Sequence, residues 1–175
     1  MFANPKTNIE QLGLSDGAVV ADFGAGSGFY SIEAARAVAP RGRVYAIDVQ
    51  KELLERLRSE ARRYHVGGID ILVGDIERLG GTKIREGSVD VVIASNVFFM
   101  LSDKKGCMTE ARRILKPGGR MLLIDWSGSF SQMGPHPDHV FYKDAARKLA
   151  SETGFSFERE IDAGSHHYGM ILRKK

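Results

Sequence analysis

The 175-residue chain has the size and the residue balance of one globular domain, with 43% hydrophobic and 27% charged residues. Its single cysteine excludes an internal disulfide framework and a cysteine-based zinc site. A net charge of +3 is too small to indicate nucleic-acid binding. No apolar run reaches the roughly 18 residues of a membrane span, and no signal-peptide pattern is present, which favours the cytoplasm. We therefore expect a single domain over residues 1–175.

The chain is expected to begin with a lead-in helix over residues 1–14, in which Pro5 suits the first turn. An apolar strand starting at Val19 ends in Asp22. Three glycines follow at alternate positions, Gly24, Gly26 and Gly28, and a helix then begins at Phe29. A buried strand, a tight glycine turn and a helix N-terminus form the place where α/β sheets hold nucleotide-like ligands.

The glycine spacing distinguishes between such ligands. A dinucleotide fingerprint is G-x-G-x-x-G, whereas here the third glycine comes one residue early and Phe29 takes its place. Asp22 at the strand end would repel a pyrophosphate and attract an ammonium group. The turn therefore favours adenosine carrying an amino-acid arm over NAD. The alternative is an ordinary glycine-rich connection between strand and helix.

Two further strands also end in acids. Residues 43–48 form the second strand, and Asp48 at its end could bond both hydroxyls of a ribose or cap the amphipathic helix predicted over residues 51–64. Residues 69–73 form the third strand, followed by Asp75 and Ile76. Asp75 could accept from an adenine amino group, with Ile76 packed on the ring, or form an Asx turn.

The fourth strand, residues 88–95, is almost continuously apolar, as expected for a strand covered on both faces, and Asn96 follows it. The remaining expected elements are a helix from residue 102 or 103 to 115, a stop at 116–119, a strand over 120–125, a loop over 127–139, a helix over 141–153 and strands over 155–161 and 167–173. Alternating strands and helices predict a parallel α/β sheet that brings the polar strand ends to one edge.

The stretches VVADFGAGSGFYS, VYAIDV, GDIERL, SVDVVIASNVFFML and LKPGGRMLLIDW resemble, in order and spacing, the motifs of class I S-adenosylmethionine-dependent methyltransferases. Within that class they resemble the small type 11 kind, related to the ubiquinone and menaquinone C-methyltransferases. This resemblance implies a Rossmann-like, doubly wound, seven-stranded sheet, mostly parallel with an antiparallel last strand. It also implies S-adenosylmethionine as cofactor and S-adenosylhomocysteine as product.

The same resemblance assigns cofactor contacts residue by residue. The methionine arm and its ammonium group fall to the first strand and its turn, the ribose and adenine to the second and third strands, and the sulfonium to the fourth. The implied cofactor-binding residues are Asp22, Gly24, Ala25, Gly26, Ser27, Gly28, Asp48, Val49, Gln50, Asp75, Ile76, Ser95 and Asn96.

Methyl transfer from a sulfonium mainly requires alignment of the acceptor, and no Ser-His-Asp, Cys-His or paired-carboxylate arrangement is evident. A hydroxyl or carbon-acid acceptor would benefit from a general base, usually histidine. Asn96, His136 and His167 are accordingly the candidate catalytic residues, with a structural or surface role as the alternative for each histidine. The spacing of His136, His139 and His167 is weak support for a metal site, and none is predicted.

The expected acceptor is a compact small molecule. The single cysteine argues against arsenite chemistry, and the short chain argues against a long isoprenoid acceptor. RNA is a weaker alternative, because most basic residues, Arg113 among them, are expected on solvated helix faces interleaved with acids such as Glu110. The sequence also leaves open a protein methyltransferase and a non-catalytic cofactor-binding module that works with a partner. Phe29 and Asp22 disfavour an NAD-dependent dehydrogenase.

Overall fold

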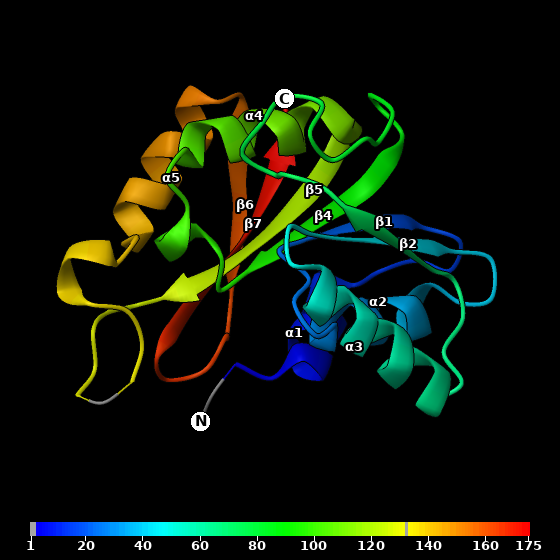
Figure 1. Ribbon diagram of the computed structural model, residues 1–175. Coiled ribbons are helices and arrows are strands. Elements are labelled where there is room, and N and C mark those ends of the chain that lie inside the picture. Colours follow the sequence, from blue (N-terminus) through cyan, green and yellow to red (C-terminus); the bar gives the residue numbers. More distant parts are fainter. Residues whose placement is uncertain (1–2, 132) are drawn as a thin grey trace.

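The computed structural model describes residues 3–131 and 133–175, and in it one seven-stranded sheet carries helices on both faces (Figure 1). Residues 1 and 2 of the predicted lead-in helix and residue 132 of the predicted loop lie outside the described residues. The strands are β1 (Val19–Phe23), β2 (Arg43–Asp48), β3 (Ile69–Val73), β4 (Val89–Ser95), β5 (Leu115–Trp126), β6 (Phe155–Ile161) and β7 (His167–Lys174). The helices are α1 (Pro5–Leu12), α2 (Phe29–Val38), α3 (Lys51–Arg63), α4 (Lys104–Ile114) and α5 (Lys143–Glu152), with short 3-10 helices η1 (Phe98–Met100) and η2 (Pro137–His139).

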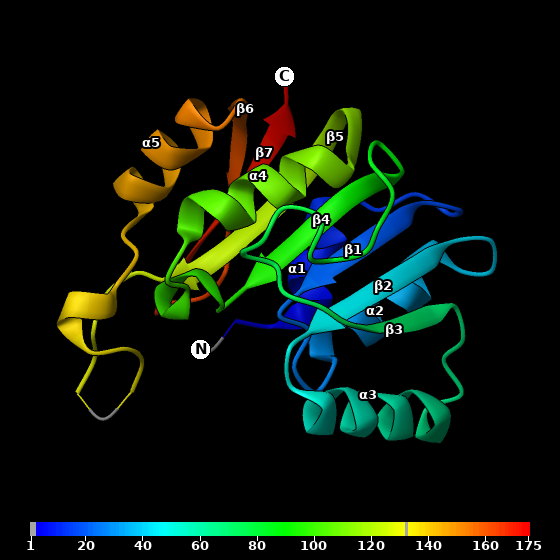
Figure 2. The ribbon, with the colours of Figure 1, turned by 45° about the horizontal axis from the view of Figure 1, so that its top comes forward.

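The strand order across the sheet is β3-β2-β1-β4-β5-β7-β6, and Figure 2 shows it from β3 to β5. The first five strands pair in parallel, whereas β7 runs antiparallel between β5 and β6. The predicted fold class, including the antiparallel last strand, is confirmed. The chain reverses its direction of winding between β1 and β4. The carboxyl ends of these strands meet at one edge, where such folds bind ligands.

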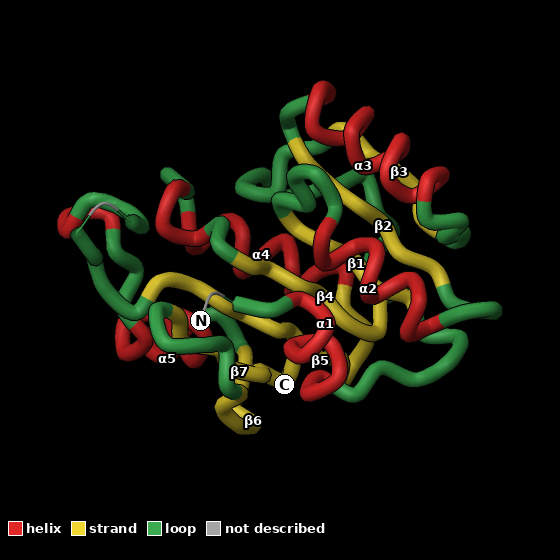
Figure 3. The backbone as a smooth tube through the Cα atoms, turned by 90° about the horizontal axis from the view of Figure 1, so that it is seen from below, coloured by secondary structure: helices red, strands yellow, loops and turns green. Residues whose placement is uncertain are grey.

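The two faces of the sheet carry different helices, as Figures 1 and 3 show. Helices α4 and α5 cover one face, where Cys107 and Ala146 join the largest apolar cluster. Helices α1, α2 and α3 cover the other face, where Leu12 of α1 and Leu57 of α3 are buried. This double cover explains the continuous apolar sequence of β4, since a strand buried on both faces has no solvent-facing positions.

Helix α1 is fastened to the turn between β6 and β7. The side chain of Gln11 donates to the carbonyl of Asp162 at 2.9 Å, and Gln11 Oε1 accepts from the backbone N–H of Asp162 at 2.9 Å. Asn4 caps the helix by accepting from the N–H of Thr7. These bonds hold the start of the chain beside the last hairpin, far from it in sequence.

Strand β5 is longer than the sequence predicts. The segment 116–119, expected as a stop after α4, lies inside β5, which begins at Leu115. Val89 of β4 pairs with Leu115 and Val91 pairs with Arg120, so an irregularity absorbs the proline and glycines of the segment. The prediction failed here because a turn-like sequence ends a strand only locally, whereas the ladder with β4 resumes beyond it.

Candidate functional site

Polar side chains from four neighbouring strands line two adjoining hollows at the carboxyl edge of the sheet. The first hollow, of about 420 Å³, is lined by Gly24, Gly26, Asp48, Val49, Gln50, Leu53, Gly74, Asp75, Ile76, Glu77, Asn96, Val97, Met100 and Leu101. The second, of about 380 Å³, is lined by Ala3, Pro5, Asp22, Gly24, Ala25, Gly26, Ser27, Phe29, Tyr30, Leu53, Ser95 and Asn96. Of the residues predicted to bind a cofactor, all but Gly28 line one hollow or the other.

The three glycines of the turn have different roles. All three have positive φ, +68° at Gly24, +53° at Gly26 and +90° at Gly28, which glycine adopts at low cost. A Cβ on Gly24 would lie 2.7 Å from Val97, and one on Gly28 would lie 2.3 Å from Leu57. A Cβ on Gly26 would meet nothing within 4 Å. Gly24 and Gly28 therefore serve packing, while Gly26 exposes its backbone to open space.

Asp48 connects the ends of β1 and β2. Its Oδ2 accepts from the N–H of Gly26 at 2.9 Å, and its Oδ1 accepts from the N–H of Gln50 at 2.9 Å. The two bonds fix the carboxylate in a buried position while each oxygen keeps a lone pair for a further donor. Gln50 is the residue that precedes α3, so Asp48 also orders the start of that helix.

Asp22 is buried deeper than any other predicted site carboxylate. Burial raises the pKa of Asp22 to about 6, although Ser31 Oγ donates to the carboxylate at 2.6 Å and opposes the shift. The negative charge of Asp48 adds to the rise. A cationic ligand in the second hollow would reverse this effect by stabilising the ionised form.

Asp75 forms the Asx turn that the sequence left open as its alternative role, since its Oδ1 accepts from the N–H of Glu77 at 2.9 Å. The loop that continues from this turn is anchored to α4 by Glu110, which sequence reasoning placed on a solvated face. Glu110 is fully buried and accepts from the N–H of Gly80 at 2.8 Å and from Arg113 Nε at 2.7 Å. The expectation that Glu110 and Arg113 belong to a free, solvated surface is therefore wrong.

The end of β4 has an unusual backbone and unpaired polar atoms. Asn96 has a positive φ of +55°, an uncommon conformation for a residue other than glycine. Its Oδ1 is buried without a hydrogen-bond partner in the described part of the chain. Ser95 Oγ is likewise buried without a hydrogen-bond partner among the described residues, although it lies beside Tyr30. Strain and an unpaired acceptor at the same residue are typical of a ligand site.

Asp125, near the end of β5, is a functional candidate that sequence reasoning missed. Its Oδ2 accepts from the N–H of Phe99 at 3.0 Å and its Oδ1 accepts from the N–H of Trp126 at 2.8 Å. Burial raises the pKa of Asp125 to about 6. The carboxylate holds η1, whose Met100 lines the first hollow. The sequence did contain a signal for this residue: Asp125 lies at the carboxyl end of its strand, as Asp22 and Asp48 do in theirs.

The two candidate histidines differ in their surroundings. His167 is 8% exposed, its ring lies 4.4 Å from that of Trp126, and neither ring nitrogen has a hydrogen-bond partner among the described residues. Burial lowers the pKa of His167, so the ring is neutral at pH 7. The side chain of His136 is 69% exposed and lies 3.3 Å from the carboxylate of Asp138 in the loop. Only His167 belongs to a strand end at the carboxyl edge.

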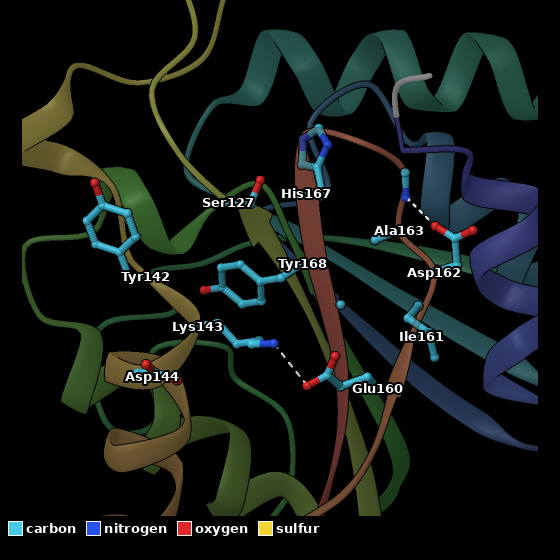
Figure 4. Close-up of a pocket in the computed structure, with 12 residues that line it drawn as sticks. Ser127, Tyr142, Lys143, Asp144, Glu160, Ile161, Asp162, Ala163, His167 and Tyr168 are labelled. Carbon is cyan, nitrogen blue, oxygen red and sulfur yellow. Dashed lines mark hydrogen bonds and ion pairs between the residues drawn. The ribbon is translucent and has the colours of Figure 1, made fainter.

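A third hollow, of about 420 Å³, lies between the start of α5 and the last hairpin (Figure 4). His167 and Ser127 are at one end of it, and the ion pair between Lys143 and Glu160, at 3.1 Å, is at the other. Tyr168 crosses the middle and donates to the carbonyl of Phe141 at 2.6 Å. Within residues 3–131 and 133–175, no three His, Cys, Asp or Glu side chains are placed to hold a metal ion.

The known proteins to which the chain is most similar in sequence include several named as methyltransferases. Arsenite methyltransferase from Halobacterium salinarum is 30% identical over 127 residues, which are 73% of this chain and 31% of that protein. A ubiquinone/menaquinone biosynthesis C-methyltransferase from Haemophilus ducreyi is 30% identical over 120 residues, 68% of this chain and 45% of that protein. The chain thus spans less than half the length of these two relatives.

A solved S-adenosylmethionine-dependent methyltransferase from Aquifex aeolicus has the same fold, with a TM-score of 0.88 at 24% identity over 98% of this chain and 90% of that one. No described helix is both long and apolar enough to cross a membrane. The family model for a methyltransferase domain matches residues 14–164. The resemblance seen in the sequence motifs is thereby confirmed, and the chain belongs to the methyltransferase domain family of the class I, S-adenosylmethionine-dependent kind.

Proposed function

We propose that the chain transfers a methyl group from S-adenosylmethionine to a small-molecule acceptor in the cytoplasm. The observation that carries this proposal is the gathering of Asp22, Asp48, Asp75 and Asn96 around an open glycine turn. Family membership supports the reaction class. The buried free thiol of Cys107 is in keeping with a reducing compartment.

The geometry of the site residues supports S-adenosylmethionine as the ligand. Asp48 keeps free lone pairs for two ribose hydroxyls, and Gly26 offers an open backbone to the methionine arm. The buried charge of Asp22 needs a cationic partner, which an ammonium group supplies. Asp75 would accept from the adenine amino group with Ile76 against the ring, and Val49 and Gln50 would flank it.

When bound, S-adenosylmethionine supplies a methyl group on a positively charged sulfur, a good leaving group that needs no acid to assist it. The task of the chain is then to align the acceptor and to exclude water. Asn96 holds its unpaired Oδ1 at the junction of the two hollows and would orient a donor group there. The apolar side chains of Leu53, Val97 and Met100 line the first hollow beside it and would limit water there once the ligand is bound.

The distribution of charge favours a small molecule over RNA. The described residues lining the first two hollows include four carboxylates, those of Asp22, Asp48, Asp75 and Glu77, and no lysine or arginine. RNA binding requires cations placed along the phosphate backbone. Arg113, one of the arginines considered for that role, is held by Glu110 instead.

Calorimetric titration of S-adenosylmethionine, S-adenosylhomocysteine and NADH tests the proposal. We expect micromolar binding of the two sulfur compounds and none of NADH. Asp48→Ala should weaken binding at least tenfold, because ribose and the glycine turn lose a shared acceptor. Asp70→Ala is the matched control, since Asp70 carries a carboxylate on β3 that pairs with exposed Arg43 at 3.3 Å. Failure of both sulfur compounds to bind, or tight NADH binding, would contradict the proposal.

A further inference from the structure

The buried side-chain polar atoms without a hydrogen-bond partner gather in one region of the described chain. They are Ser95 Oγ, Asn96 Oδ1 and the two ring nitrogens of His167. A buried donor or acceptor that stays unpaired lowers stability, so such groups need an explanation in a folded protein. Asn96 borders the two hollows assigned above to the cofactor, whereas His167 borders neither. The unpaired nitrogens of His167 therefore indicate a second ligand.

The sheet register gives the spacing between these groups. Ser95 pairs with Ile124 across to β5, and Trp126 pairs with His167 across to β7. With strands about 4.8 Å apart and residues about 3.3 Å apart along a strand, the Cα atoms of Ser95 and His167 lie about 12 Å apart. Both side chains leave the same face of the sheet, because paired residues share a face. This separation suits a molecule of about one ring.

The third hollow adjoins His167 and has the wrong charge for an anion. Three carboxylates line it, those of Asp144, Glu160 and Asp162. Lys143, the one lysine or arginine among its described lining residues, is engaged by Glu160. Figure 4 shows this pair at the end of the hollow opposite His167. A phosphate or carboxylate entering here would meet several like charges and a cation that is already paired. On the face that His167 shares with Ser95, it would also meet the carboxylates of Asp22 and Asp48 in the hollows that Asn96 borders.

We propose that the methyl acceptor is a small molecule without negative charge, and that His167 holds its hydroxyl or amino group on the face of the sheet that it shares with Ser95. This inference rests on the proposed function. A neutral imidazole has one N–H donor and one acceptor nitrogen, the complement of a group that both donates and accepts.

Trp126 provides a direct reporter, because it is the only tryptophan in the chain and its ring lies 4.4 Å from that of His167. The protein saturated with S-adenosylhomocysteine is titrated with phenol, aniline, benzoate and phenyl phosphate while Trp126 fluorescence is recorded. We expect phenol and aniline to give saturable changes, with benzoate and phenyl phosphate binding at least tenfold more weakly. His167→Leu should weaken phenol binding at least tenfold. His167→Gln, which keeps a donor and an acceptor, should retain more of it.

Exposed His139→Leu is the matched control and should leave phenol binding unchanged. Thermal unfolding gives a second readout, since His167→Leu removes two unpaired nitrogens and should keep or raise the melting temperature. Equal affinity for phenyl phosphate, no binding of either neutral probe, unchanged phenol affinity in His167→Leu, or a clear fall in its melting temperature would overturn the inference. Calorimetry with S-adenosylhomocysteine on the same sample separates the cases, because failure at that step contradicts the proposed function instead.

Discussion

Asp22 is a carboxylate whose ionisation opposes folding. Its pKa of about 6 in the folded protein lies above the ordinary value of 3.8, chiefly because it is buried. The folded state therefore holds the proton to higher pH than the unfolded state, and the free energy of unfolding falls as pH rises from about 4 to about 6. Above pH 6 the ionised group costs about 3 kcal/mol. Under the proposed function, the ammonium group of the bound cofactor would offset this cost.

The protonation of Asp22 should govern the affinity for S-adenosylmethionine. The ammonium group favours the ionised carboxylate, so we expect affinity to fall about tenfold from pH 7 to pH 5, as the fraction ionised falls. Asp22→Asn should bind more weakly at pH 7, lose this pH dependence and be more stable at pH 7. Ser31→Ala removes a bond that stabilises the charge and should move the midpoint to higher pH. Calorimetry between pH 5 and pH 8 checks each variant, and an unchanged pH profile in Asp22→Asn would refute the assignment.

At the scale of elements, α4 fixes the loop between β3 and β4, and part of this loop lines the first hollow. Glu110 binds the loop between β3 and β4 through Gly80 and Thr82, while a Cβ on Gly106 would lie 2.2 Å from the carbonyl of Glu77. The loop residues Asp75, Ile76 and Glu77 line the hollow. Their position therefore depends on a helix that does not itself line the hollow.

Removing this support should affect both stability and binding. Glu110→Ala removes the buried carboxylate that Arg113 and Thr82 share, and we expect a loss of about 3 kcal/mol in the free energy of unfolding, measured with urea. Hydrogen exchange should rise first in residues 74–84, and S-adenosylhomocysteine should bind more weakly. Glu55→Ala, which breaks an exposed pair with Arg58 on α3, should cost less than about 1 kcal/mol. Similar losses in the two variants would contradict the anchoring role.

The same elements show what the sequence could predict. Continuous apolar runs predicted the central strands β1 and β4, because burial on both faces leaves a local signal. The burial of Glu110 could have been predicted from the sequence, since it lies on the same buried face of the helix as Cys107, Ala111 and Ile114. Its partners in the loop could not have been predicted, because they lie 28 to 30 positions away in the sequence. The extension of β5 through residues 116–119 likewise depends on pairing with β4, which no local pattern contains.

At the scale of the whole molecule, the charge of the site is opposite in sign to the net charge of the chain. The chain carries +3, yet among the described residues four carboxylates and no lysine or arginine line the first two hollows. The lysines and arginines of the described chain therefore lie outside these two hollows, many of them in ion pairs such as Arg41 with Asp16 and Arg173 with Glu158. A negative site on a basic protein attracts a cation at short range without steering one from afar.

This local field should favour the cofactor over its product. S-adenosylmethionine carries one more positive charge than S-adenosylhomocysteine, so its binding should be the more sensitive to salt. Between 0.1 and 1 M NaCl the screening length falls from about 10 Å to about 3 Å, and we expect affinity for S-adenosylmethionine to fall several-fold further than that for S-adenosylhomocysteine. Asp75→Asn should reduce the difference while it keeps an acceptor for adenine. Parallel calorimetric titrations measure both slopes. Equal slopes would mean that the carboxylates act through hydrogen bonds alone, and preferential release of the product would then need another cause.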